Sequence, residues 1–147
     1  SAGWFERAVA TDATTGLGIV AAPVAEHDAR DTVTKEDAAA LAARASWRVI
    51  AAAPWGAQEH INVLEMRALT TAVRWVLSHP RAVDSRVLVL SDSQVVVGAV
   101  TKGRSSSQPL LRRLRFLAAL VLASGLRLTL RWLPSELNPA DEPSRRF

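Results

Sequence analysis

The sequence contains no cysteine, no tyrosine and a single methionine among its 147 residues. The lack of cysteine excludes disulfide bonds and every zinc site built on thiolates. Long hydrophobic runs are also missing, because the apolar stretches are interrupted by arginine or are too short to span a bilayer. We therefore expect no transmembrane helix and no membrane partner. Charged residues within the first twelve positions do not fit a signal peptide, so we expect an intracellular protein of the cytoplasm or nucleus.

Hydrophobic residues make up 49% of the chain, and the 18 basic and 14 acidic residues leave a net charge of +4. This hydrophobic content and length are sufficient for one folded domain over residues 1–147. Half of the basic residues follow position 100. Such an uneven distribution of positive charge indicates a polyanionic partner.

The first candidate functional residue lies in a predicted β-hairpin. Runs of small and β-branched residues flank residues 13–17, a pattern typical of two strands joined by small residues and a glycine. Alternation places Ala8, Ala10 and Asp12 on one face of the first strand. An acid at the end of an apolar strand is costly to bury unless its charge is compensated. Asp12 is either an ordinary turn residue or a functional carboxylate.

Periodicity and turn residues predict the remaining elements. Residues 18–22 and 46–53 are expected to complete three successive antiparallel strands, with a loop at 23–33 and a capping box at 34–37 before a short helix at 38–45. Further expected elements are helices at 62–78, 94–100 and 110–124, strands at 86–90 and 126–133, and the start of a last helix at 138–145.

Three more acids stand at the ends of these elements. Asn62 and Glu65 have the spacing of a capping box, although Glu65 can also face a neighbouring strand end. Asp92 follows a strand that is buried on both faces, where α/β sheets place their sites, but a helix cap explains it equally. Asp141 lies in the last turn segment. A cap or turn explains each acid alone, whereas four together favour a functional site.

These acids belong to four motifs, and each motif falls in a suitable structural context. They are Thr11-Asp12-Ala13-Thr14 with Gly16 and Gly18, Asn62-Val63-Leu64-Glu65, Ser91-Asp92-Ser93-Gln94, and Asn138-Pro139-Ala140-Asp141 with Ser144 and Arg145. With these four motifs in this order, the chain resembles a ribonuclease H domain of a retroelement reverse transcriptase. The motifs at residues 61–65 and 138–141 are most similar to those of the tyrosine-recombinase-bearing group. The resemblance implies an α/β, ribonuclease-H-like fold: a five-stranded mixed sheet, first strand central, flanked by helices. It also implies a larger polyprotein with a covalently linked or adjacent reverse transcriptase domain.

The resemblance implies a reaction that suits the acids. Hydrolysis of a phosphodiester requires an activated water and a stabilised leaving oxygen, which two divalent ions about 3.5–4 Å apart provide. Mg²⁺ prefers oxygen ligands, which carboxylates supply. By resemblance Asp12, Glu65, Asp92 and Asp141 are the catalytic residues and the ligands of two Mg²⁺ ions, for which Mn²⁺ can substitute, with Asp12 shared between the ions. The implied enzyme cuts the RNA strand of RNA/DNA hybrids during reverse transcription and leaves 3′-hydroxyl and 5′-phosphate ends.

Substrate contacts are also implied by the resemblance. Asn62 and Gln94 match positions that touch the minor groove of the hybrid, and Thr14 matches a segment that approaches RNA 2′-hydroxyls. Basic residues of a patch between positions 102 and 115 would neutralise phosphates, although a solvated helix face explains any single arginine. The predicted phosphate contacts are Lys102, Arg104, Arg112 and Arg113.

The sequence departs from the family pattern in two places. Many members carry a mobile histidine shortly before the last aspartate, whereas residues 133–140 contain none and offer Glu136 as a substitute. His27, His60 and His79 are expected on the surface or in caps. Only six residues follow Asp141, so the final helix is expected to be short or absent. The alternatives are a catalytically weak hybrid-binding or scaffold module of a polymerase, and a nuclease or integrase of the same fold acting on DNA.

Overall fold

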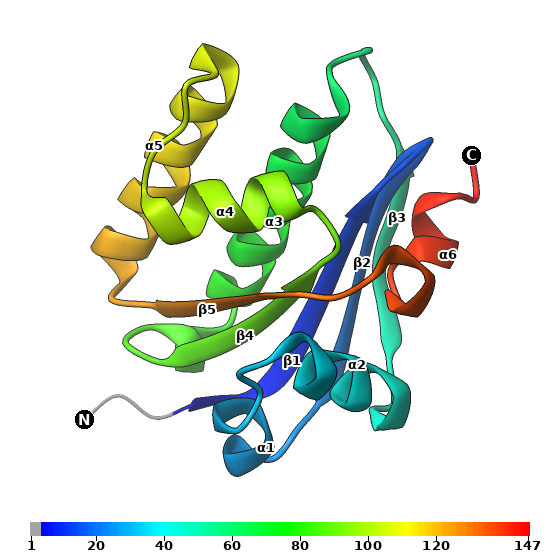
Figure 1. The fold of residues 1–147 in the computed structure, drawn as a ribbon. Helices are drawn as coiled ribbons and strands as arrows, with labels where there is room; N and C mark the ends of the chain where they lie inside the picture. The colour runs from blue at the N-terminus through cyan, green and yellow to red at the C-terminus, as the bar shows by residue number, and fades with distance from the viewer. Residues whose placement is uncertain (1–3) are drawn as a thin grey trace.

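The computed structural model describes residues 4–147, in which a five-stranded mixed sheet carries helices on both faces (Figure 1). The strand order is β3-β2-β1-β4-β5, so the first strand is central, as predicted. β1 pairs with β2 in antiparallel and with β4 in parallel orientation, β2 and β3 are antiparallel, and β4 and β5 are parallel. The strands are β1 Trp4–Ala13, β2 Gly16–Pro23, β3 Arg48–Pro54, β4 Arg86–Ser91 and β5 Arg127–Trp132.

The helices form two layers around this sheet. One layer contains α3, α4 and α5, and the other contains α1 and α2, with α6 beside the ends of β1 and β2 (Figure 1). Within residues 4–147, no helix combines the length and apolar character needed to cross a membrane. The helices are α1 Glu26–Arg30, α2 Lys35–Arg44, α3 Ile61–Leu77, α4 Gln94–Lys102, α5 Gln108–Ser124 and α6 Asp141–Ser144, with 3₁₀ turns at Pro80–Ala82 and Ser135–Leu137.

Small side chains let the central strand contact both helical layers. Ala8 and Ala10 face the cluster around Leu41 of α2, whereas Val9 faces the cluster around Leu69 of α3. The neighbouring β4 is buried on both faces, as its continuous apolar run predicts, because all four residues of 87–90 are fully inaccessible. Packing on both faces of the sheet therefore fixes the positions of the carboxyl ends of β1 and β4.

Two expectations about local structure are wrong. Residues 23–33 were expected to form a loop but include α1, a helix of five residues that buries Ala29. So short a helix shows too little apolar periodicity to be recognised. The Asn62–Glu65 capping box is also absent: His60 is the N-cap of α3, and its Nδ1 accepts from the Asn62 N–H at 3.1 Å. The expected capping role is therefore confirmed for His60, and Glu65 is left available for other contacts.

The glycines of the hairpin serve packing rather than the turn itself. The connection consists of Thr14 and Thr15, and neither Gly16 nor Gly18 has a positive φ. A Cβ atom added at Gly18 would lie 2.5 Å from the Ala140 carbonyl oxygen and 2.8 Å from a backbone nitrogen of α6. Gly18 is therefore required for the close approach of α6 to β2.

Candidate active site

Three of the predicted acids come together from three different elements. Asp12 lies near the end of β1 and Asp92 directly follows β4. Because these parallel strands are neighbours, with Thr11 opposite Ser91, the two acids emerge side by side. Glu65 reaches them from α3, and one carboxylate oxygen of each acid lies within 4.8 Å of the others. The structure therefore places the acids of the first three motifs at one edge of the sheet.

Asp12 and Glu65 are the most deeply buried members of this trio, with exposed fractions of 2% and 6%. The Ala13 N–H donates to Asp12 Oδ1 at 2.8 Å and to Glu65 Oε1 at 3.2 Å. The Ser144 hydroxyl donates to Asp12 Oδ2 at 3.3 Å. Glu65 Oε2 is buried and has no hydrogen-bond partner among residues 4–147. A buried carboxylate oxygen without a partner is costly, so this atom points to a ligand that the site accepts.

Burial and mutual repulsion raise the pKa values of the three carboxyl groups. Burial raises the pKa of Asp12 to about 7, and the charge of Asp92 adds to this increase. Burial, followed by the charge of Asp12, raises the pKa of Glu65 to about 9. Burial likewise raises the pKa of Asp92. Close carboxylates therefore retain protons near neutral pH unless a cation compensates their charge.

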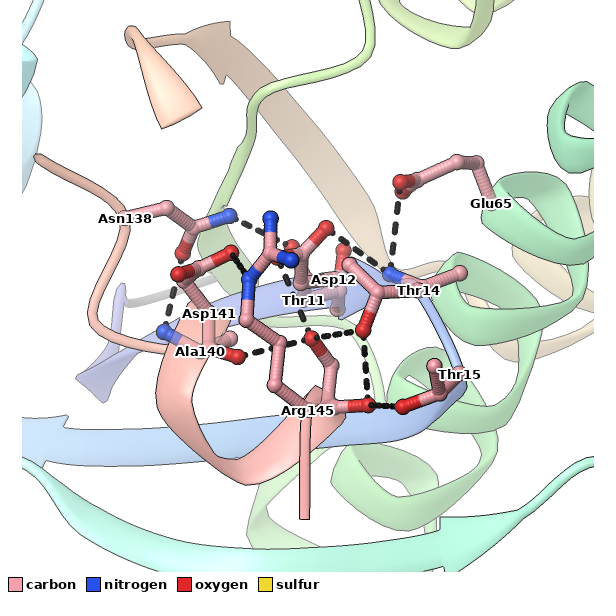
Figure 2. A network of polar contacts seen from close by, with 11 residues as sticks. Thr11, Asp12, Thr14, Thr15, Glu65, Asn138, Ala140, Asp141 and Arg145 are labelled. Atoms are coloured by element: carbon pink, nitrogen blue, oxygen red, sulfur yellow. Dashed lines mark hydrogen bonds and ion pairs between the residues drawn. The ribbon is translucent and has the colours of Figure 1, made fainter. Parts of the chain in front are cut away.

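Asp141 lies next to the trio and forms an ion pair with an arginine side chain. It begins α6, and the Arg145 Nε donates to its Oδ1 at 2.8 Å, as Figure 2 shows. Its side chain is 31% exposed. Asp141 is close enough to Asp12 to raise the pKa of that carboxyl. The fourth predicted acid is thus at the site, in a more open position than Asp12 and Glu65.

Buried polar contacts fasten the segment that carries Asp141 to the end of β1 (Figure 2). Asn138 Nδ2 donates to the Thr11 carbonyl at 2.9 Å, and the Ala140 N–H donates to Asn138 Oδ1 at 3.0 Å. The Thr14 hydroxyl donates to the Ser144 carbonyl at 2.7 Å. Asn138 and Ser144 belong to the fourth motif, but no role is predicted for either of them from the sequence. Their positions in the motif were the only available indication.

An open cleft of about 660 Å³ lies beside the acids. Asn62 and Gln94, two of the predicted substrate residues, line it together with Glu65 and Asp92. Glu136, the proposed substitute for the missing histidine, also lines the cleft, from the 3₁₀ turn after β5. Residues of α3, of α4 and of the segment between β5 and α6 therefore line the cleft.

A second hollow, of about 570 Å³, adjoins the cleft because both are lined by Gln94 and Val95. It extends along α4 to Lys102 and Arg104, which are both exposed. These two predicted phosphate contacts consequently lie on a path that leads to the acids.

Other predicted substrate residues lie away from this path. Arg112 and Arg113 line a separate hollow of about 290 Å³ with Phe116, and Arg113 pairs with Glu59 at 3.7 Å. The four predicted phosphate contacts are thus divided between two hollows, because Arg112 and Arg113 share theirs with Val63 of α3. The Thr14 hydroxyl is engaged in holding α6.

The donor set fits a hard divalent cation. The described ligand atoms of the trio are all carboxylate oxygens, and one of them, Glu65 Oε2, lacks a partner. Mg²⁺ prefers such oxygens and is commonly bound through a few carboxylates and waters. Asp12, Glu65 and Asp92 would hold the ion, and Asp141 is the nearest further donor.

No protein-family model matches the chain, and a search of curated proteins finds no match. Among solved structures, LC11-RNase H1, isolated from compost by a metagenomic approach, is similar with a TM-score of 0.62 and 20% identity over 94% of this chain and 91% of that one. Its complex with an RNA/DNA hybrid gives a TM-score of 0.59 and 20% identity over 92% and 91%. The N-terminal RNase H domain of a Mycobacterium tuberculosis protein, solved as a fusion with maltose binding protein, gives 0.53 and 19% identity over 92% of both chains. These likenesses show the ribonuclease-H-like fold that the sequence predicts.

Proposed function

We propose that this chain is a ribonuclease H that hydrolyses the RNA strand of RNA/DNA hybrids. The observation that carries this proposal is the meeting of Asp12, Glu65 and Asp92 at one edge of the sheet, with Asp141 beside them. The fold supports it, because solved RNase H1 structures share this architecture and one of them is in complex with an RNA/DNA hybrid.

We assign the four acids as ligands of two Mg²⁺ ions, with Mn²⁺ as a substitute. Bound metal ions of this kind activate water and stabilise charge at the departing oxygen of a phosphodiester. The protein contributes fixed carboxylates: the Ala13 N–H and the Ser144 hydroxyl hold the two oxygens of Asp12 in place. The Asp12 carboxylate is close to the other two acids of the trio, with one oxygen of each acid within 4.8 Å of the others, which supports its role as the shared ligand. Such fixed ligands reduce the reorganisation that the reaction requires.

The cleft beside the acids is the proposed hybrid site. Asn62 and Gln94 present amide groups in its lining, and amides can both donate to and accept from base edges and 2′-hydroxyls in a minor groove. Lys102 and Arg104 in the adjoining hollow would neutralise phosphates. Arg112 is assigned the same role farther along α5. The pairing of Arg113 with Glu59 and of Thr14 with Ser144 leaves weaker contacts for these two side chains.

The four motifs also support a biological setting for this activity. We infer that the chain is the ribonuclease H domain of a retroelement reverse transcriptase of the tyrosine-recombinase-bearing group. A covalently linked or adjacent reverse transcriptase domain would then be its partner, and the cytoplasm or nucleus its location.

The test is incubation of the protein with labelled RNA/DNA hybrid, double-stranded RNA and double-stranded DNA, in Mg²⁺ or in EDTA. We expect cleavage of the RNA strand of the hybrid, with 3′-hydroxyl ends, only when Mg²⁺ or Mn²⁺ is present. Glu142→Gln is the matched control, because it removes an exposed acid next to Asp141 whose ion pair is with Arg146. Equal cleavage of double-stranded DNA, or full activity in EDTA, contradicts the proposal.

A further inference from the structure

Two arginines at the end of the chain make similar ion pairs on α6. Arg145 Nε donates to Asp141 Oδ1 at 2.8 Å, and Arg146 Nη2 donates to Glu142 Oε2 at 2.9 Å. Both pairs join residues four positions apart, and the arginine side chains are 61% and 46% exposed. Exposed pairs of this kind contribute little to folding stability. A role for either pair must therefore come from what surrounds it.

The surroundings of the two arginines differ. The pKa of the Arg145 guanidinium is raised first by Asp141, and the charges of Asp12 and Asp92 act in the same direction. The pKa of Arg146 is raised by Glu142 alone. Figure 2 shows the Arg145 side chain running beside Asp141 toward Asp12 and Asn138. Arg145 is thus close enough to Asp12 and Asp92 for their charges to act on it, whereas the charge that acts on Arg146 is that of Glu142.

This arrangement places a fixed positive charge on one of the proposed metal ligands. The Asp141 oxygen that accepts from Arg145 is engaged, so a cation that uses this oxygen must displace the guanidinium or share the carboxylate with it. The same charge offsets part of the repulsion among the four acids when no cation is bound. Arg145 therefore competes with a divalent ion for the role of compensating charge.

We propose that Arg145 is the internal counter-ion of the carboxylate site, pairing with Asp141 until a divalent cation binds and thereby lowering the affinity of the site for Mg²⁺. Arg145 is a positioning residue, because it acts through Asp141. The inference rests on the proposed function in one respect, which is that the acids bind a divalent cation.

The experiment measures the Mg²⁺ dissociation constant of the whole chain by isothermal titration calorimetry, without substrate. Arg145→Gln removes the charge and keeps a hydrogen-bond donor, Arg145→Lys keeps the charge, and Arg146→Gln is the matched control. We expect Arg145→Gln to bind Mg²⁺ about six- to tenfold more tightly, since a unit charge about 6–8 Å from a divalent ion in a water-like dielectric produces a repulsion of this size. Arg145→Lys and Arg146→Gln should stay close to the parent.

An unchanged or higher dissociation constant for Arg145→Gln overturns the inference, and a higher one means that Arg145 orients Asp141 for the metal. Circular dichroism of each variant in EDTA shows whether it folds, and Arg145→Met provides a second charge-removing variant. Asp92→Asn separates the two proposals. If the parent does not bind Mg²⁺, or if Asp92→Asn binds it as tightly as the parent, the metal site and this inference both fail. If the parent binds Mg²⁺ and Asp92→Asn abolishes this binding, but Arg145→Gln and Arg146→Gln have the same Mg²⁺ affinity, only the inference fails.

Discussion

Replacement of Glu65 by glutamine should make the metal-free protein more stable. Glu65 is 6% exposed, its Oε1 accepts from the Ala13 N–H, and its Oε2 has no partner within residues 4–147. Glutamine has the same shape, so its amide oxygen retains the bond from Ala13 and its amide nitrogen can donate to Asp12. The substitution therefore removes a buried group that must take up a proton when the protein folds at neutral pH, and it creates no cavity.

The size of the effect follows from the pKa of Glu65, which is raised from 4.5 to about 9 by burial and by the charge of Asp12. Between these values the folded protein binds more protons than the unfolded chain, so the free energy of unfolding falls as pH rises. The contribution of Glu65 is most favourable below its unfolded pKa and is lost as pH approaches 9. At about 1.4 kcal/mol per pH unit, the cost at pH 7 is of order 3 kcal/mol, which is the upper limit of the gain for Glu65→Gln.

The assay is urea denaturation in EDTA at several pH values between 5 and 8. The parent should lose more stability over this range than Glu65→Gln, and the control Glu142→Gln should follow the parent. Addition of Mg²⁺ should then stabilise the parent and have little effect on Glu65→Gln. The reasoning is refuted if Glu65→Gln is the less stable protein at pH 7 in EDTA, or if the parent becomes more stable as pH rises.

Three further predictions concern other parts of the site. Asp92→Asn should abolish cleavage and remain at least as stable as the parent in EDTA. Mg²⁺ at ten times its Kd should raise the Tm of the parent by roughly 3–6 °C, and Asp92→Asn should lose most of this rise. A clearly lower Tm of the variant in EDTA would make Asp92 a structural cap. Replacing Arg112 and Arg113 together by alanine should flatten the salt dependence of hybrid binding by up to about 1.8 in a logarithmic plot, and an unchanged slope would place both on a solvated face. Gly18→Ala should lower stability by roughly 1–3 kcal/mol, because its Cβ would lie 2.5 Å from a backbone oxygen of the α6 segment. Gly98→Ala, which has no atom within 4 Å of the added Cβ, should be neutral or stabilising in the same denaturation assay.

Much of the fold could be predicted because it depends on local patterns. The apolar run of β4 corresponds to burial on both faces, and the alternation in β1 corresponds to contacts with two different core clusters. The Thr34–Asp37 capping box of α2 is confirmed. Gly125 ends α5 in the left-handed conformation, as expected for a glycine after a helix. These features are determined by residues that are close together in the sequence.

The polar support of the site could not be predicted in this way. Asn138 contacts Thr11 across 127 positions, and Ser144 contacts Asp12 across 132. No periodicity connects such residues, because the contact exists only after the sheet has formed and α6 has packed on it. The cap at His60 was missed for a different reason: Asn62 and Glu65 offered a more usual capping pair, but Glu65 is turned toward β1 instead. The link to a reverse transcriptase stays a prediction.

The central claim is that the buried carboxylates cleave the RNA strand of a hybrid, and its most direct test is a single-turnover assay of the parent and of Asp12→Asn. Asp12 is chosen because it contacts the other elements of the site and is 2% exposed. The hybrid carries a different label on each strand, and both proteins are assayed at saturating Mg²⁺ after their folding has been verified. We expect cleavage of the RNA label alone by the parent, and a loss of at least about a thousandfold in rate for Asp12→Asn. Equal rates for the two proteins, or cleavage of the DNA label, would contradict it.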